Sequence, residues 1–340
     1  MYSLPKITFG IIVLNGEPFL RYNLRSIYPF AHQVIIVEGA VTSASENATP
    51  DGHSRDETLE EIYRFKDKED KKNIVQIITR DGFWNEKDEM SIAYVEKATG
   101  GYLWQIDIDE FYHARDIQRV IDIIGKDKSI SGLSFYWKNF WGGFDYVANG
   151  WEYRDSVCRM NGIRRIFKWG KNFQYISHRP PTIADGKNRD LCDLNWIGPD
   201  VTSKLGIYCY HYGMVFPKQA KEKMRYYSNM WQSHKNMDNW YKDTYRQLKF
   251  PFRILHGTKP PSWLTRFKGQ HPEAVKQLVH DLKSGKIKLD FRRTDDIENL
   301  LNSRCYKITI YFMNLRNAAR NIFRIIRNLP ENMKMSHQSR

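Results

Sequence analysis

The string LWQIDIDEFY at residues 103–112 is the strongest candidate for a functional site in the chain, because carboxylates directly follow an apolar run. Side chains at positions i and i+2 of a strand share a face and lie roughly 6–7 Å apart, so Asp107 and Asp109 can address one ligand together. Two carboxylates that close repel each other unless a cation joins them, and hard oxygen ligands suit Mg²⁺ or Mn²⁺. The alternative is an acidic helix start after a strand, which does no chemistry.

The elements that must position these aspartates alternate between strand and helix over the first part of the chain. Nearly continuous β-branched apolar runs are typical of strands buried on both faces, and apolar residues spaced near 3.6 are typical of helices. The pattern predicts strands at residues 7–14, 34–37, 74–79 and 102–108, and helices at 17–28, 56–68 and 85–98. Strands separated by helices imply right-handed crossovers and an α/β fold with a mainly parallel sheet flanked by helices.

Ligands of such sheets gather at the carboxyl ends of the strands. The polar segments at those ends should therefore converge on one crevice, and they are Asn15, Glu38, the loop 39–55, residues 80–82 and residues 107–110. Beyond residue 116 the pattern changes. It predicts a short helix to 124, a strand at 132–137, an aromatic and glycine-rich stretch of mixed β structure, and helices at 217–233, 273–283 and 308–328.

Composition bounds the class of protein. Of 340 residues, 41% are hydrophobic and 14% aromatic, which is ample for a core and excludes disordered and collagen-like chains. No apolar run approaches the ~20 residues that cross a bilayer, and residues 1–14 resemble a first strand rather than a secretion signal. The four cysteines stand far apart, which argues against a disulfide framework and a zinc ribbon. We therefore expect a cytoplasmic protein.

The chain is strongly basic. Its 53 Lys and Arg exceed 39 Asp and Glu by +14, which favours polyanionic or phosphorylated partners and anionic membrane surfaces. Residues 305–340 alone hold seven Lys or Arg and one Glu. Apolar residues and arginines share the helix predicted there, which is typical of a helix that lies peripherally on an anionic membrane. Docking onto the chain's own domain is equally compatible with this pattern.

The context of the aspartates resembles a known family. From Trp84 to Glu110 the chain has a polar helix, a glycine pair, an aromatic-led strand and Asp-x-Asp-Glu, which resembles GT-A glycosyltransferases, particularly those similar to family 2. Upstream, Asn15-Gly16-Glu17 is similar to that family's Asn-Glu segment, and Glu38 stands where the family often has an acidic residue that contacts the nucleoside. Residues 51–58 resemble its Ser-x-Asp-x-Thr segment. The resemblance covers about residues 5–235.

The resemblance implies a GT-A-like (Rossmann-like) fold and metal-dependent transfer of a sugar from a nucleotide-diphosphate donor to a hydroxyl of a glycan or glycolipid acceptor. A Mn²⁺ or Mg²⁺ ion at the diphosphate would stabilise the charge of the leaving group. The implied metal ligands are Asp107, Asp109 and His211, with His211 alternatively a hydrogen-bonded histidine of a half-buried strand. The implied donor-binding residues are Asn15, Glu17, Glu38, Arg80 and Asp107.

These roles suggest an organisation of the chain. We expect a GT-A-like catalytic domain at 1–250, with a nucleotide-binding half at 1–115 and an acceptor half at 116–250. A helical, basic C-terminal extension at 251–340 should follow.

The sequence departs from the family at the catalytic base. Relatives often have Arg-x-Phe and later His-Glu, whereas this chain has His178-Arg179, and an arginine cannot act as a base at pH 7. An inverting transfer needs a carboxylate to remove the proton of the acceptor hydroxyl. The candidates are Asp185, Asp190, Asp193 and Asp200, with Asp185 preferred as the catalytic residue beside Asp109. A retaining transfer needs no such base, so the stereochemistry stays open.

Aromatic residues are dense between 135 and 153. Because sugar rings stack their C–H faces on aromatic planes, Trp137, Trp141 and Trp151 could form an acceptor platform, although aromatics in a strand-rich segment often belong to the core.

Two rival functions fit the composition less well. A basic nucleic-acid-binding protein should carry a basic stripe across a sheet, but the most pointed strand end here is acidic, so no nucleic acid is expected. A sugar nucleotidyltransferase should have a glycine-rich, basic loop after its first strand, which Asn15-Gly16-Glu17 does not supply.

Overall fold

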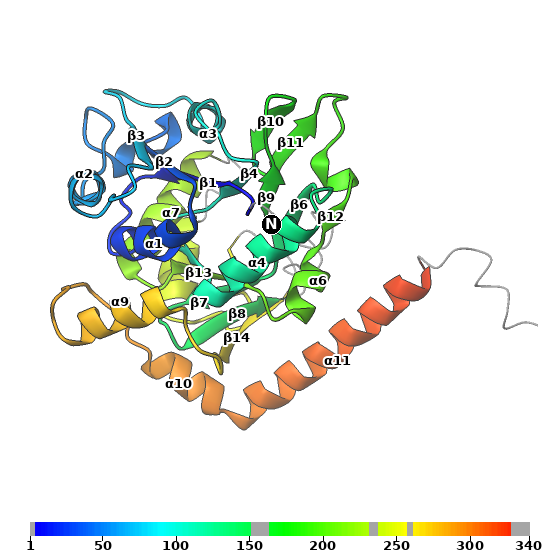
Figure 1. Cartoon of the computed structure of the whole chain (residues 1–340). Helices are drawn as coiled ribbons and strands as arrows, with labels where there is room; N and C mark the ends of the chain where they lie inside the picture. The colour runs from blue at the N-terminus through cyan, green and yellow to red at the C-terminus, as the bar shows by residue number, and fades with distance from the viewer. Residues whose placement is uncertain (1–3, 151–162, 231–236, 257–260, 328–340) are drawn as a thin grey trace, which may run out of the picture.

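A computed structural model describes residues 4–150, 163–230, 237–256 and 261–327 (Figure 1). The strands are β1 (Ile7–Val13), β2 (Gln33–Glu38), β3 (Val75–Ile78), β4 (Tyr102–Gln105), β5 (Glu110–Phe111), β6 (Gly132–Phe135), β7 (Trp137–Trp141), β8 (Tyr146–Gly150), β9 (Ile163–Lys168), β10 (Phe173–His178), β11 (Pro181–Asp185), β12 (Trp196–Ile197), β13 (Cys209–Met214) and β14 (Ser262–Arg266). The α-helices are α1 (Leu20–Ile27), α2 (Thr58–Lys68), α3 (Lys87–Val95), α4 (Ala114–Lys126), α6 (Pro199–Lys204), α7 (Pro217–Met230), α8 (Met237–Trp240), α9 (Glu273–Lys283), α10 (Asp295–Asn302) and α11 (Arg304–Arg327).

The central sheet has seven strands in the order β12-β6-β9-β4-β1-β2-β3. The pairs β1–β2, β1–β4, β2–β3 and β6–β12 are parallel, and β9 alone runs antiparallel between β4 and β6 among these described strands. β1 lies inside this order, between β4 and β2, and its apolar residues are buried on both faces of the sheet. The carboxyl ends of β1, β2 and β4 consequently meet at one edge of the sheet.

Helices cover both faces of this sheet. Leu24 of α1 and Val120 of α4 share a buried cluster with Phe9 of β1. Tyr94 of α3 belongs to a second cluster on the opposite face. Gly10 makes room for α3, because a Cβ at that position would lie 2.4 Å from the Tyr94 ring. The predicted fold class, an α/β fold with a mainly parallel sheet flanked by helices, is confirmed.

The aspartates of the Asp-x-Asp string lie in a turn. The strand expected at 102–108 ends at Gln105, and the chain then turns into β5 of a second sheet. The backbone N–H of Glu110 donates to the Asp107 carbonyl over 3.0 Å, which closes this turn. Asp107 and Asp109 therefore occupy the connection between two sheets, and their side chains do not share one face of a strand as the spacing alone predicts.

The second sheet has five strands in the order β14-β8-β7-β13-β5. In it, His211 of β13 pairs with Glu110 of β5 on one side and with Asn139 of β7 on the other. β14 pairs antiparallel with β8, although β14 belongs to the segment 251–340, for which only helices were expected. This sheet therefore continues across residue 250. The segment also contains the expected α9 and α11, and α10 as an additional helix.

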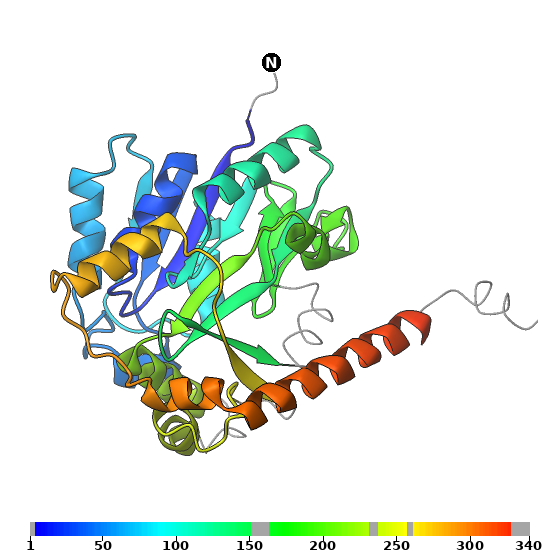
Figure 2. The same cartoon turned by 90° about the horizontal axis from the view of Figure 1, so that it is seen from below.

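Helix α11 projects away from the body of the protein in both views (Figures 1 and 2). Tyr306 anchors its first turn, because the buried Tyr306 hydroxyl accepts the backbone N–H of Leu264 over 2.9 Å. Four large apolar side chains farther along are between 49% and 63% exposed, namely Ile308, Tyr311, Phe312 and Leu315. None of the described helices is both long enough and apolar enough to span a bilayer.

Candidate functional site

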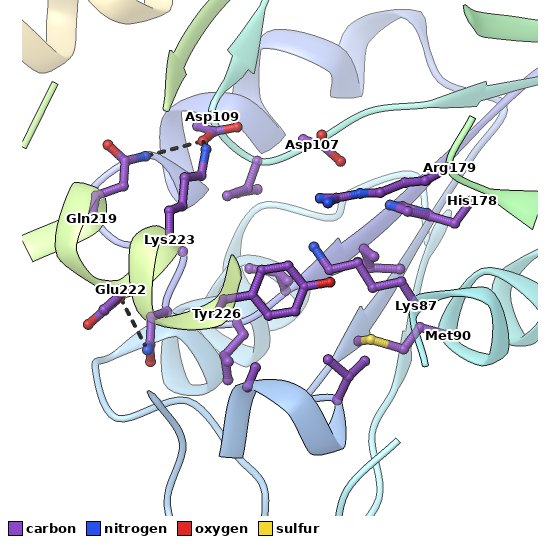
Figure 3. A pocket seen from close by; sticks show the side chains of 18 of the residues that line it. Lys87, Met90, Asp107, Asp109, His178, Arg179, Gln219, Glu222, Lys223 and Tyr226 are labelled. Atoms are coloured by element: carbon purple, nitrogen blue, oxygen red, sulfur yellow. Dashed lines mark hydrogen bonds and ion pairs between the residues drawn. The ribbon is translucent and has the colours of Figure 1, made fainter. Parts of the chain in front are cut away.

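A pocket of about 690 Å³ opens at the carboxyl ends of β1 and β4, between the β4–β5 turn, α3, the β10–β11 hairpin and α7 (Figure 3). Its volume falls within the range of small-molecule sites, about 300–1,000 Å³. The residues predicted for the site that line this pocket are Asn15, Glu17, Asp107, Asp109, Trp137 and His211. Glu38, Arg80, Trp141 and Asp185 are not among its described lining residues. Trp151 lies outside the residues that the structure describes.

Asp109 is the most buried acid of the pocket, at 6% exposure. Its Oδ2 accepts hydrogen bonds from Lys223 Nζ over 2.7 Å and from Gln219 Nε2 over 3.2 Å, both on α7. Its Oδ1 lies 3.5 Å from Nε2 of His211. Burial by itself would raise the pKa of Asp109, but the Lys223 ammonium and His211 outweigh it and lower that pKa. Asp109 is therefore ionised throughout the neutral range.

His211 is held with one ring nitrogen facing Asp109. Its Nδ1 lies 2.6 Å from Oδ1 of Asn139, and an amide oxygen only accepts, so Nδ1 carries the proton in the neutral ring. The imidazole also stacks on Trp137, with ring centroids 5.0 Å apart and planes inclined by 20°. The lone pair on Nε2 thus points towards Asp109 and towards Lys223 Nζ, which is 3.4 Å away. A partner on Nδ1 that orients a histidine in this way is typical of metal-ligating histidines.

The donor atoms of this pair fit a divalent cation in part. Mg²⁺ and related ions commonly take one or two protein ligands and complete their shell with substrate phosphates and water, which Asp109 and His211 can provide for. The predicted third ligand, Asp107, is directed elsewhere. Among the described residues, no group of three or more His, Cys, Asp or Glu side chains gathers around one point. The ammonium of Lys223 occupies the position between Asp109 and His211, so a divalent ion must displace it.

Asp107 belongs to a buried network of charges. Nη2 of Arg165, on β9, lies 2.9 Å from Asp107 Oδ2, and the same guanidinium forms two hydrogen bonds of 2.7 and 2.6 Å with Glu110. Trp137 Nε1 donates to Glu110 over 3.0 Å. Burial would raise the pKa of Asp107, but Arg165 and His178 lower it to about 2. Arg165 therefore fixes the β4–β5 turn. Glu110, the last acidic residue of the Asp-x-Asp-Glu string, has a structural role.

Glu38 lies behind the pocket. It is fully buried, and its Oε1 accepts from both the backbone N–H and the hydroxyl of Ser54 over 2.8 Å. Its Oε2 lies 2.9 Å from Nδ1 of His53, and this hydrogen bond raises the pKa of His53. The Ser54 hydroxyl in turn accepts the backbone N–H of Asn15 over 3.0 Å. Glu38 thus anchors the loop 39–55 against the end of β1, so the contact with a nucleoside expected of it would have to be indirect.

Asn15 and Glu17 line the pocket just after the end of β1. Asn15 has a left-handed backbone with φ of 51°, which asparagine tolerates better than most residues, and its Nδ2 donates to the Asn47 carbonyl over 2.8 Å. Oε1 of Glu17 is buried without a hydrogen-bond partner in the described part of the chain. Burial raises the pKa of Glu17 to about 7, so its carboxyl can either donate to or accept from a ligand.

Arg80 and Asp185 are engaged away from the pocket. Arg80 Nη1 lies 2.9 Å from Glu89, and its guanidinium covers the Trp84 ring at 4.0 Å. Asp185 ends β11, where it accepts from Nε and Nη2 of Arg189 over 3.0 and 2.7 Å. The structure therefore does not bring Asp185 to the pocket, because the β10–β11 hairpin closes on its own turn.

The two described tryptophans of the expected acceptor platform lie in different environments. Trp137 is half-buried and lines the pocket beside His211. Trp141 is 2% exposed and packs against Tyr245 with ring centroids 5.1 Å apart, so it is placed in the core of the second sheet. Of the described pair, only Trp137 lines the pocket.

Lys223 is a pocket residue whose role is hard to recognise from its sequence context. It stands in a run of basic residues on α7 that is typical of a solvated helix face, whereas its ammonium reaches Asp109. A signal was present, because Lys223 precedes the buried Met224 and lies three residues after the buried Ala220. Lys87 and Tyr226, which also line the pocket, were not singled out at all.

No family model and no curated protein matches this chain. Among solved structures, S. aureus TarS superposes with a TM-score of 0.34 at 11% identity, over 48% of this chain and 28% of that one. Glucosyl-3-phosphoglycerate synthase from Mycobacterium tuberculosis, in complex with Mn²⁺, UDP-glucose and phosphoglyceric acid, superposes with a TM-score of 0.30 at 14% identity, over 39% of this chain and 44% of that one. The matched region thus spans less than half of either protein.

Proposed function

We propose that this protein is a glycosyltransferase that moves a sugar from a nucleotide-diphosphate donor to a hydroxyl of a glycan or glycolipid acceptor. The observation that carries the proposal is the cluster of Asp109, His211 and Lys223 beside a pocket at the carboxyl ends of the parallel strands. An ionised carboxylate, an oriented imidazole and an ammonium together suit a cation and a polyphosphate better than they suit an uncharged ligand.

The chain's own residues account for the main requirements of such a transfer. Asp109 and His211 would hold a divalent ion, and when bound this ion supplies positive charge at the departing diphosphate. Lys223, once the ion has displaced it from its position between Asp109 and His211, contributes a second positive charge close by, and burial in the pocket strengthens its effect. Asn15 and Glu17 offer polar groups on the side of β1, and Trp137 offers an apolar ring for the sugar. The loop 39–55, which Glu38 anchors, forms part of the pocket wall.

The proposal predicts that nucleoside diphosphates stabilise the protein in a cation-dependent manner. UDP, GDP and ADP, each with and without Mn²⁺, are to be compared in thermal unfolding. One of them with Mn²⁺ should raise the melting temperature by a few degrees, because a ligand that binds only the folded state stabilises it. The matching nucleoside, which lacks phosphates, serves as the control. If none of the three diphosphates raises the melting temperature above that of the protein alone, a nucleotide-sugar donor is refuted.

We also propose that α11 contacts an anionic membrane, in keeping with a glycolipid acceptor. The support is the combination of exposed apolar side chains, Tyr311 and Phe312 foremost, with the basic residues of the same helix. Replacing both residues by serine should weaken co-sedimentation with phosphatidylserine vesicles about tenfold or more, since each buried aromatic contributes about 1.5–3 kcal/mol.

The control for this test is Phe250→Ser, which removes an aromatic side chain that is 48% exposed elsewhere on the surface. Removal of residues 308–340 should have the same effect as the double substitution while it spares the buried Tyr306. Vesicle binding that survives both changes would exclude α11 as the membrane contact.

A further inference from the structure

Two basic side chains line the part of the pocket that faces away from Lys223. Lys87 is the first residue of α3, and Arg179 follows the end of β10. Nζ of Lys87 lies 4.7 Å from the centre of the Tyr226 ring, and Cζ of Arg179 lies 5.8 Å from the same centre. Figure 3 shows both side chains directed into the space between Tyr226 and Asp107. The pocket therefore has a second basic region, distinct from the one at Asp109.

In the part of the chain that the structure describes, these two basic side chains have no acidic partner. Across the described ranges, neither Lys87 nor Arg179 forms an ion pair with a carboxylate. Asp107, which faces them, is engaged by Arg165. Asp88, the residue after Lys87, accepts the backbone N–H of His178. Positive charges placed in a pocket without counter-charges are unfavourable, and an anionic ligand supplies what is missing.

The electrostatics of Lys87 agree with this. Burial, followed by the positive charge of Arg179, lowers the pKa of Lys87 to about 7. Asp107, Asp109 and Lys223 also act on this ammonium, the two acids opposing the shift and the lysine adding to it. An anion bound beside Lys87 would restore its protonated form.

Tyr226 adds a third donor beside the two basic side chains. Its hydroxyl is buried and makes no hydrogen bond of normal geometry in the described part of the chain, and Ser43 is a side chain close enough to act on its pKa. A buried hydroxyl without a partner loses the free energy of its hydrogen bonds to water, so a ligand atom that accepts from it is favoured. An ammonium, a planar guanidinium and a phenol around one space are together suited to a carboxylate or a phosphate.

We propose that Lys87, Arg179 and Tyr226 bind an anionic group, a carboxylate or a phosphate, that the substrates carry in addition to the diphosphate of the donor. The inference rests on the proposed sugar transfer and specifies its substrate class. The anion has two possible sources. It belongs either to the sugar, as in a uronic acid, or to the acceptor, as in a phosphorylated or carboxylated glycan.

The test has one arm for each source. In the donor arm, binding of UDP-glucuronic acid and UDP-glucose is compared by calorimetry, or GDP-mannuronic acid and GDP-mannose where guanosine is the preferred base. In the acceptor arm, glycerol 3-phosphate and glycerol are compared with protein saturated by the nucleoside diphosphate and Mg²⁺. The wild type should bind the anionic probe at least about tenfold more tightly in one arm, as expected for charge-assisted hydrogen bonds.

The variants Lys87→Gln and Arg179→Gln should each remove most of this preference, and Tyr226→Phe should reduce it severalfold. Their affinity for the nucleoside diphosphate itself should stay within about twofold. Lys97→Gln is the matched control, because it removes the same charge from an exposed position just after α3.

Two results would overturn the inference: a wild type that prefers the anionic probe in neither arm, or variants that weaken anionic and neutral probes alike. Failure of every nucleoside diphosphate to bind the wild type is a different outcome, because it removes the proposed sugar transfer on which the inference rests.

Discussion

Replacement of Asp109 by asparagine should reduce sugar transfer by about 100- to 1,000-fold, the loss that accompanies removal of one fixed electrostatic group from an active site. Asparagine retains the shape of the side chain and can still accept from Gln219 Nε2, but it carries no negative charge for a cation. The amide also leaves the Lys223 ammonium without its counter-charge. The expected loss of activity therefore results from the loss of the negative charge. It is measured as the rate of sugar transfer from the nucleotide sugar that the stabilisation screen selects.

The matched control is Asp122→Asn, which removes an exposed carboxylate of α4. Because Asp109→Asn can also destabilise the protein, urea unfolding must accompany the activity assay, and Asp109→Asn combined with Lys223→Gln restores the balance of charge. A folded variant with near-normal turnover would contradict the role of Asp109. A hundredfold loss on Asp185→Asn would, in contrast, restore Asp185 as the base in spite of its position on the β10–β11 hairpin.

Replacement of Arg165 by methionine should lower the free energy of unfolding by about 3–5 kcal/mol, the cost of leaving a buried charge without its partner. Arg165 and Glu110 have side-chain exposures of 6% and 0%, and their hydrogen bonds connect the central sheet to the second sheet. Methionine fills much of the same volume, so the loss of charge dominates the effect. Urea unfolding measures the difference, provided that the slope against denaturant is unchanged.

Arg189→Met provides the comparison, because it breaks an ion pair with Asp185 in which the arginine side chain is 54% exposed, and it should cost at most about 1 kcal/mol. Adding Glu110→Gln to Arg165→Met should recover part of the lost stability, since it neutralises the stranded carboxylate. If Arg165→Met unfolds at the same urea concentration as the wild type, the buried network does not stabilise the β4–β5 turn.

Much of the central sheet could be predicted because its strands are local apolar runs. The strand expected at 7–14 is Ile7–Val13, and the one expected at 34–37 is Gln33–Glu38. The fourth strand was predicted too long for a physical reason. Ile106 is 1% exposed and continues the apolar pattern, but it is buried beneath the turn and not in the strand. Burial alone does not distinguish these two situations.

The site was predictable in part. The resemblance named Asp109 and His211 together, and the structure brings them within 3.5 Å of each other although they lie far apart in the chain. It could not place Lys223, because a basic run on a helix is solvated or inward-facing according to how the helix packs. Asp185 failed to reach the pocket for a similar reason, since the pairing of β10 with β11 determines its position and is not local.

The pairing of β14 with β8 has a consequence for how the chain acquires its structure. Residues 146–150 expose one row of backbone N–H and C=O groups until Ser262–Arg266 covers them. During synthesis more than a hundred residues must emerge before that happens, and an open strand edge of this kind readily pairs with other chains. Cells that produce this protein therefore depend on its last third to protect the middle third from aggregation.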